Sequence, residues 1–336
     1  MVSKETSAAK DAARTLRVGV VGAGVMGTNH GRVLAGLPGI EMVGIVDPML
    51  EHRTRAEKLI GCKTFLDLDA LLTTGVDAVV IAAPTHLHHE IALACIAKGI
   101  HALVEKPVAS TVEEGRDIVD AARKAGVTLM IGHVERFNPA VAAIKKAIEG
   151  EDILSIGITR VGPFPPRMSN VGVVIDLAVH DIDLIRWFTE SDIVEVQPQL
   201  ASAVAEREDI ALLQFRTASG VLAHINTNWL TPFKARNVTV ATRGKYVMGD
   251  LLTRQVTECF GFKPDGSYSM RHLPVGHDEP LRAELIAFLD AVRTGNVPAV
   301  TGDEGVASLE IAIRCLEQPA KPAASAARKG PRRIAG

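Results

Sequence analysis

Short, continuously apolar runs alternate with helical patterns through the first half of the chain. The runs are rich in valine and isoleucine and do not alternate with polar residues, which is typical of strands in a parallel sheet covered on both faces. They lie at 16–22, 42–47, 78–83, 102–105 and 127–131, and helical stretches lie at 25–36, 51–60, 87–98, 111–125 and 138–149. Strand and helix in repeated succession predict a doubly wound α/β domain over residues 16–150.

The second half has a different pattern, in which strand-like segments follow one another with few helices between them. These segments lie at 152–161, 193–205, 209–217, 220–230 and 237–243. Turn residues separate some of them, for example at 217–220. Helical patterns lie at 176–190, 280–294 and 303–316. The second half therefore predicts an α+β domain over residues 151–318 with a large open, mostly antiparallel sheet.

Both ends of the chain lack these patterns. Residues 1–15 are polar and alanine-rich, and residues 319–336 carry five positive charges and no acidic residue. We expect both ends to be disordered, the second as a basic, solubilising tail. The alternative for that tail is an arm that binds an anionic partner.

Composition excludes several classes of protein. Lys and Arg total 37 and Asp and Glu total 39, so the formal net charge of −2 gives no field that would hold a nucleic acid. No apolar run has the length of a membrane span, and the first residues lack a secretory signal. The four cysteines are far apart, which argues against a disulfide scaffold or a zinc module. We expect a cytoplasmic protein without membrane or nucleic-acid partners.

A glycine-rich loop follows the first predicted strand and opens the first predicted helix. Residues 22–27 read Gly-Ala-Gly-Val-Met-Gly, the G-x-G-x-x-G pattern of a dinucleotide-binding loop in its expected context. Gly22 permits the tight turn, Gly24 lets the backbone approach a pyrophosphate, and Gly27 lets helix and strand pack closely. The helix N-terminus, with Val25 and Met26, then offers N–H groups to the phosphates.

Asp47 ends the second predicted strand, where a carboxylate can bind the adenosine ribose hydroxyls and repel a 2′-phosphate. This favours NAD over NADP as the cofactor. The neighbouring cations His52, Arg53 and Arg55 leave some tolerance of NADP open.

The segment Glu105-Lys106-Pro107 follows the strand at 102–105 and is preceded by the histidine-rich PTHLHHE at 84–90. Together with the glycine loop, VIDLAVHD at 174–181 and VTGDEGVASLEIA at 300–312, it resembles the oxidoreductase family typified by glucose–fructose oxidoreductase and myo-inositol dehydrogenase. The resemblance implies a Rossmann domain, a second domain whose open sheet often forms an oligomer interface, a nicotinamide cofactor and sugar-like or polyol substrates. It also implies a cofactor pocket that includes Pro84, Thr85, His88, Glu105 and Lys106.

Three further segments narrow the resemblance. GHVERFNPA at 132–140, RVGPFPPR at 160–167 and DLAVHDID at 176–183 are similar to UDP-N-acetylglucosamine 3-dehydrogenases, which oxidise the C3 hydroxyl of that sugar nucleotide. In such systems a pyridoxal-phosphate aminotransferase commonly converts the 3-keto product to a 3-amino sugar, in the biosynthesis of lipid A or other cell-surface glycans. The resemblance therefore implies functional coupling to an aminotransferase.

Oxidation of an alcohol needs a base for the hydroxyl proton and a group that stabilises the developing alkoxide. Lys106 follows a parallel strand at the sheet edge where such folds bind ligands, and its ammonium can donate to the reacting oxygen. Asp176 and His180 lie four residues apart on a predicted helix and share one face. We expect His180 to act as the base, with Asp176 orienting the substrate or the catalytic groups. The alternative for Lys106 is a surface lysine that follows a strand. The alternative for Asp176 is a helix cap, with His180 as its hydrogen-bonded partner and no role in catalysis.

A nucleotide sugar carries a diphosphate, which recruits arginines and amide donors. The substrate-binding candidates are Glu135, Arg136, Asn138, Arg160, Arg167 and Asn170. Each arginine can equally be a solvated loop charge or part of an interdomain salt bridge. We expect no metal site, because neither the histidines at 86–89 nor the cluster of His180, Asp181 and Asp183 shows a zinc-ligand spacing.

Three functions remain open at this point. The first is NAD-dependent oxidation of UDP-N-acetylglucosamine at C3. The second is oxidation of a related uronate, an inositol or a free sugar. The third is a regulator that binds NAD(P) without catalysis, which the presence of Lys106, Asp176 and His180 disfavours. The predicted open sheet further suggests a homo-oligomer, a dimer or a tetramer.

Overall fold

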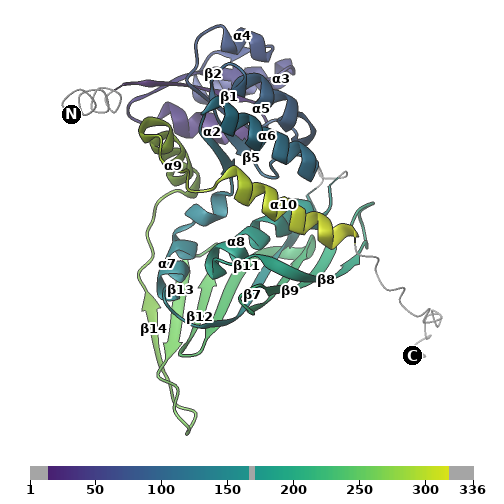
Figure 1. Ribbon diagram of the computed structural model, residues 1–336, viewed down its shortest axis with the longest axis vertical. Helices are drawn as coiled ribbons and strands as arrows, with labels where there is room; N and C mark the ends of the chain where they lie inside the picture. Colours follow the sequence, from purple (N-terminus) through teal and green to yellow (C-terminus); the bar gives the residue numbers. More distant parts are fainter. Residues whose placement is uncertain (1–13, 166–170, 318–336) are drawn as a thin grey trace, which may run out of the picture.

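The structure is a computed structural model, and it describes residues 14–165 and 171–317. Two sheets, each covered by helices, form two domains that meet along helix α10, Gly302–Glu317 (Figure 1). The expectations for residues 1–13 and 318–336, including most of the predicted disordered ends, lie outside the described residues.

The first domain holds a six-stranded parallel sheet in the order β3-β2-β1-β4-β5-β6. Its strands are β1 (Leu16–Val21), β2 (Ile40–Val46), β3 (Thr64–Phe65), β4 (Ala78–Ile81), β5 (His101–Glu105) and β6 (Leu129–Gly132). Its helices are α2 (Val25–Ala35), α3 (Leu50–Ile60), α4 (Leu68–Leu72), α5 (His88–Ile96) and α6 (Val112–Ala125), with a 3₁₀ turn η1 at Thr85–Leu87. The strand order reverses direction between β1 and β4, and ligands bind at such a switch point in open α/β sheets.

The strand interiors explain why the pattern in the sequence predicted this sheet. The four residues of β4 and the four of β6 are all buried, as strands covered on both faces must be. The strand β3 and the helix α4 were not predicted, because two and five residues are too short to show a period.

The second domain begins with α7 (Pro139–Ala147), which follows η2 (Val134–Phe137) and buries Val141 and Ile144 in the second hydrophobic core, so the predicted boundary at residue 150 is too late. This domain contains an eight-stranded sheet. In chain order its strands are β7 (Ile153–Pro163), β8 (Ile193–Ala201), β9 (Ile210–Thr217), β10 (Leu222–Asn228), β11 (Leu230–Thr242), β12 (Lys245–Asp250), β13 (Gln255–Phe260) and β14 (Ser269–Leu273). The spatial order is β14-β13-β12-β11-β7-β10-β9-β8, and only β7 and β10 run parallel. The mostly antiparallel sheet is confirmed, although β12, β13 and β14 were not predicted.

One face of this second sheet is covered and the other is open. Helices α7, α8 (Val179–Thr189) and α10 lie over the covered face (Figure 1). In β9 the buried and exposed residues alternate, with Phe215 inside and Leu212 outside. The open face also exposes Leu222, Tyr246 and Met248.

The last two helices return the chain to the first domain. Helix α9 (Pro280–Thr294) buries Leu285 and Phe288 in the first hydrophobic core, and α10 contacts α6 and β6 there as well as α8 and β8 of the second domain. This corrects the expectation that residues 151–318 form one continuous second domain: the apolar face of α9 completes the first core. The same return brings residues of α9 and α10 close to the edge of the sheet where ligands bind.

No helix in the two described ranges combines the length and the apolar composition that a bilayer crossing requires.

Candidate active site

The glycine loop has the geometry of a phosphate cradle. Gly22 has φ of +99°, and a Cβ there would lie 2.6 Å from the carbonyl oxygen of Ala82. A Cβ on Gly27 would lie 1.8 Å from the oxygen of Gly22, whereas a Cβ on Gly24 would meet nothing within 4 Å. The turn therefore needs two of the glycines for its own packing and leaves open space above the third.

The start of α2 is open beside this space. Its N-cap, Gly24, offers no side chain to the first N–H groups of the helix, and Val25 and Met26 are exposed. Unpaired N–H groups at a helix N-terminus favour a bound anion. The loop residues therefore fit the pyrophosphate of a dinucleotide.

Asp47 holds the loop in place from the end of β2. Its carboxylate accepts the backbone N–H of Ala23 at 2.8 Å and that of Met49 at 2.8 Å, and only 6% of the residue is exposed. The cations that suggested NADP tolerance are occupied nearby. Arg53 donates to the carbonyl of Asp47 at 2.7 Å, and Arg55 donates to the carbonyl of Ala23 at 2.9 Å.

His88 connects the ends of two strands. Its Nε2 lies 2.8 Å from the carbonyl oxygen of Ala83, after β4, and its Nδ1 lies 3.0 Å from that of Pro107, after β5. Burial lowers the pKa of His88 although both carbonyls oppose this effect. Only 1% of His88 is exposed, so in this structure its ring contacts these two strand ends, and its place in the cofactor pocket stays a prediction.

Lys106, Asp176 and His180 come together where the two domains meet. The ammonium of Lys106 donates to the main-chain oxygen of Asp176 at 2.7 Å and lies 3.4 Å from its carboxylate. Asp176 lies in a π-helical turn, η3 (Val174–Ala178), that leads directly into α8. This corrects the expected single α-helix: the wider turn carries Asp176, and π-turns of this kind recur at functional sites.

His180 lies in an environment that keeps it neutral. Burial and the nearby charge of Lys106 hold the pKa of His180 well below its ordinary value. Its buried Nδ1 has no hydrogen-bond partner among the described residues. A neutral imidazole beside an ammonium can accept a proton from a substrate hydroxyl that the ammonium binds.

His133 is a neighbour that the sequence analysis missed. It directly follows β6, and its ring meets that of His180 edge to face with 6.1 Å between the centroids. Its Nδ1 lies 3.8 Å from the carboxylate of Asp183, and burial lowers its pKa. The signal in the sequence was its place at the carboxyl end of a parallel strand, the same edge that carries Lys106.

A buried ion network lies beside His180. The guanidinium of Arg160, on β7, donates to Asp181 through Nη2 at 2.7 Å and to Glu135 through Nη1 at 2.8 Å. Arg236, on β11, donates to the same oxygen of Glu135 at 2.8 Å. Burial raises the pKa of Glu135, but the two arginines outweigh it and leave that pKa below its usual value. Glu135 therefore stays ionised between two cations.

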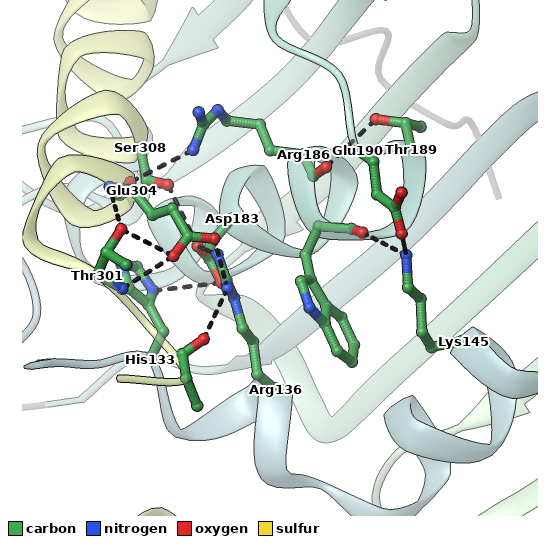
Figure 2. Close-up of polar contacts among 12 residues, drawn as sticks. His133, Arg136, Lys145, Asp183, Arg186, Thr189, Glu190, Thr301, Glu304 and Ser308 are labelled. Atoms are coloured by element: carbon green, nitrogen blue, oxygen red, sulfur yellow. Dashed lines mark hydrogen bonds and ion pairs between the residues drawn. The ribbon is translucent and has the colours of Figure 1, made fainter. Parts of the chain in front are cut away.

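A second network fixes Arg136 (Figure 2). Its guanidinium donates to both carboxylate oxygens of Asp183, at 2.7 and 2.6 Å, and to Glu304 of α10 at 2.8 Å. Glu304 in turn accepts the N–H and the hydroxyl of Thr301. This network joins η2, α8 and α10, and so locks the two domains together beneath the site.

These contacts correct four of the expected substrate ligands. Arg136 and Arg160 are 6% and 3% exposed and are each held by two carboxylates, so neither is free to bind a diphosphate. Glu135 is used by two arginines, and Asn138 caps α7 and donates to the carbonyl of Leu251. Both arginines instead form ion pairs with carboxylates that η2, α8 and α10 bring together. Arg167 and Asn170 lie outside the described residues.

The Arg160 network predicts a large cost in stability when its cation is removed. Arg160→Met leaves the fully buried Asp181 without a cation. We expect urea denaturation to show a free energy of unfolding lower by about 3 kcal/mol, as for other buried pairs that lose one partner. The control is Arg243→Gln, which removes an exposed pair with Asp152 and costs about 0.5 kcal/mol or less. Equal losses in both variants would refute the proposed importance of the buried pair.

One further cluster lies behind Lys106. His30, Glu105 and Glu284 have ligand atoms within 4.8 Å of one another, the one such group of three found among the described residues. His30 Nε2 lies 2.7 Å from Glu105, whereas neither carboxylate oxygen of the fully buried Glu284 has a hydrogen-bond partner within residues 14–165 and 171–317. Burial and the charge of Glu105 raise the pKa of Glu284 well above its ordinary value. A proton on Glu284 accounts for the cluster, so we assign no metal to it.

The raised pKa of Glu284 predicts a dependence of stability on pH. Because the folded state holds this proton more tightly than the unfolded chain, stability is present below about pH 4 and is lost as the pH rises. In Glu284→Gln the group does not titrate, so the melting temperature of the native chain falls relative to the variant between pH 5 and pH 8. The exposed Glu149→Gln is the control and has no such trend. Parallel pH curves for native chain and Glu284→Gln contradict a protonated Glu284.

The fold and this site define a nicotinamide-dependent oxidoreductase. A family model described as an oxidoreductase family with an NAD-binding Rossmann fold matches residues 16–133, and the GFO/IDH/MocA C-terminal domain matches residues 162–247. The chain belongs to the GFO/IDH/MocA family of oxidoreductases, and its cofactor is NAD. The resemblance noted in the sequence is thereby confirmed.

Similar proteins within this family act on different substrates. UDP-N-acetylglucosamine 3-dehydrogenase of Acidithiobacillus ferrooxidans is 30% identical over 82% of this chain and 88% of its own length. Inositol 2-dehydrogenase 4 of Saccharopolyspora erythraea is 32% identical over 88% of this chain and 90% of its own. A solved structure of the Acidithiobacillus enzyme has a TM-score of 0.83, with 27% identity over 89% of this chain and 96% of that one. The family relationship thus leaves the substrate open.

Proposed function

We propose that this oxidoreductase uses NAD to oxidise the C3 hydroxyl of UDP-N-acetylglucosamine to the 3-keto sugar nucleotide. The observation that carries the proposal is the meeting of Lys106, Asp176 and His180 at the carboxyl edge of the NAD-binding sheet. The similarity to the Acidithiobacillus enzyme, in sequence and in structure, supports the choice of substrate.

The residues of the site divide the chemistry between them. The ammonium of Lys106 has three donors, of which two point to the main-chain and carboxylate oxygens of Asp176, so one is left for the substrate hydroxyl oxygen. His180, held neutral, takes the hydroxyl proton. Asp176 keeps the ammonium in place. When bound, NAD supplies the hydride acceptor, with Gly22, Gly24 and Gly27 at its pyrophosphate and Asp47 at its ribose.

A substrate panel tests the proposal directly. We expect NADH absorbance to rise when the protein is given NAD and UDP-N-acetylglucosamine, and to rise further with a 3-aminotransferase and an amino donor that remove the keto product. The corresponding uronate and myo-inositol are the competing substrates. No NADH with the sugar nucleotide, together with turnover of another substrate, would overturn the substrate and leave the reaction class.

Inositol is the second candidate substrate, and the identity to the inositol 2-dehydrogenases favours it. A neutral polyol needs donors around one ring but no cation for a diphosphate. A kcat/KM for myo-inositol above that for UDP-N-acetylglucosamine would establish this alternative. Lys106→Ala distinguishes a dehydrogenase from a non-catalytic regulator. A sensor of NAD keeps its function in that variant, whereas a dehydrogenase loses its activity.

The open face of the second sheet supports a proposed homo-oligomer. Apolar side chains are exposed on the side that none of the described helices covers (Figure 1), namely those of Leu212, Leu222, Tyr246 and Met248. Such a face is stabilised when a second copy buries it. Light scattering should therefore give a mass of two or four chains, and Leu222→Glu should shift it towards one. A single-chain mass for the native protein rejects the proposal.

A further inference from the structure

The second domain carries a cation, Arg236, whose side chain makes a single ion pair among the described residues, with Glu135. Arg236 lies on β11 opposite Arg160 of β7, and Val238 and Val240 of the same strand are buried under the helices. Because side chains alternate along a strand, Arg236 faces the same side as these valines, which is the side of Lys106 and His180.

Arg236 differs from Arg160 in its exposure and its partners. Its side chain is 36% exposed, against 3% for Arg160, and its recorded acceptor among the described residues is a single oxygen of Glu135. Arg236 also lies close enough to His180 for its charge to lower the pKa of that imidazole. One edge of its guanidinium is therefore available to a ligand beside the proposed catalytic groups.

Lys234 adds a second exposed cation at the same end of β11. It is exposed, and its Cγ lies 3.5 Å from the position that a Cβ of Gly162 on β7 would occupy. The stem of Lys234 therefore lies beside Gly162 of β7. Arg160 and Arg236 are matched in charge by the two acids that bind them, Glu135 and Asp181, and the exposed Lys234 adds a positive charge at this end of β11.

We propose that Arg236, assisted by Lys234, binds the diphosphate of the substrate and so selects a nucleotide sugar over a neutral polyol. The inference rests on the proposed function and assigns its anion-binding residues. A guanidinium with one edge held by a carboxylate and the other free is suited to a bidentate contact with a phosphate. A neutral polyol has no negative charge that could pair with the cations Arg236 and Lys234.

Binding of UDP, which carries the diphosphate without the sugar, tests the inference without turnover. Calorimetry on the NAD-loaded protein should show UDP bound at least about tenfold more weakly by Arg236→Gln, and more weakly by Lys234→Ala, than by the native chain. In steady-state assays, Arg236→Gln should raise KM for UDP-N-acetylglucosamine about tenfold or more with a smaller change in kcat, as expected for lost ground-state binding. Arg243→Gln, directly after the other end of β11, is the control and leaves both the affinity for UDP and the KM unchanged.

The outcomes separate this inference from the proposed function. Equal affinity for UDP in the native chain, Arg236→Gln and Lys234→Ala overturns the inference even if UDP-N-acetylglucosamine is oxidised. Weaker UDP binding in the variants, with no oxidation of that sugar by the native chain, keeps the anion site and rejects the substrate. If Arg236→Gln fails to fold, Arg236→Lys and Lys234→Ala decide: unchanged affinity in both refutes the site.

Discussion

Lys106→Ala is expected to lower kcat/KM about 10³-fold, a loss typical for removal of one group that stabilises developing charge at the reacting oxygen. Two N–H groups of the Lys106 ammonium donate to Asp176, and the variant removes the third, which we propose donates to the substrate hydroxyl. NAD binding should change far less, because the pyrophosphate is held by the glycine loop. Initial rates with saturating NAD, together with a fluorescence titration of NAD, measure both quantities.

Two further variants test whether the loss of rate is specific to the ammonium of Lys106. Lys106→Arg keeps the charge but not the compact ammonium that fits beside Asp176, so it should recover only part of the rate. Lys98→Ala removes an exposed lysine after α5 and should leave the rate unchanged. A Lys106→Ala protein within tenfold of the native kcat/KM would contradict a role at the reacting oxygen.

The first domain could be predicted from the sequence because its determinants are local. A buried parallel strand must be apolar along its whole length, and the glycine turn needs Gly22 and Gly27 for steric reasons that no other residue meets. Lys106 was predicted for the same reason: it follows a recognisable strand, and the carboxyl ends of parallel strands are where such sheets bind ligands.

The partners of the arginines could not be predicted, because they come from elements that are distant in the sequence. Arg160 meets Asp181 and Glu135 only once β7, α8 and η2 have packed together, and Arg136 meets Glu304 only through the return of α10. A charged residue in a loop-like segment gives no sign of such a partner. Glu284 could not be predicted for the same reason, because it lies close to Glu105 but belongs to α9, far along the sequence.

The position of the reacting groups shows why the ion networks matter for function. Asp181 and Asp183 alternate with His180 and Ile182 at the start of α8, and each is bound by an arginine. These contacts fix the rotation of α8 and with it the direction of His180. If His180 is the base that we propose, stability and catalysis are coupled at this helix, so the variants that test catalysis need a melting curve beside each rate.

His180→Asn is expected to lower kcat/KM by about 10²–10³ at pH 8, the usual contribution of a general base. Asparagine has a similar size and can still donate a hydrogen bond, but it cannot take a proton at neutral pH. His277→Asn, at an exposed position before α9, is the matched control and should not change the rate.

The pH profile distinguishes loss of a base from loss of structure. Because burial and Lys106 hold the pKa of His180 well below its ordinary value, we expect the native enzyme to keep this proposed base unprotonated at pH 6.5 and to lose activity only at lower pH. The variant has no base to protonate, so its acid limb should disappear while its rate rises with hydroxide at high pH. The same depressed pKa means that the native fold loses stability as the pH falls below about 6.5, and His180→Asn should soften that loss. A variant that keeps the native acid limb, at any reduced rate, would assign the proton transfer to another group.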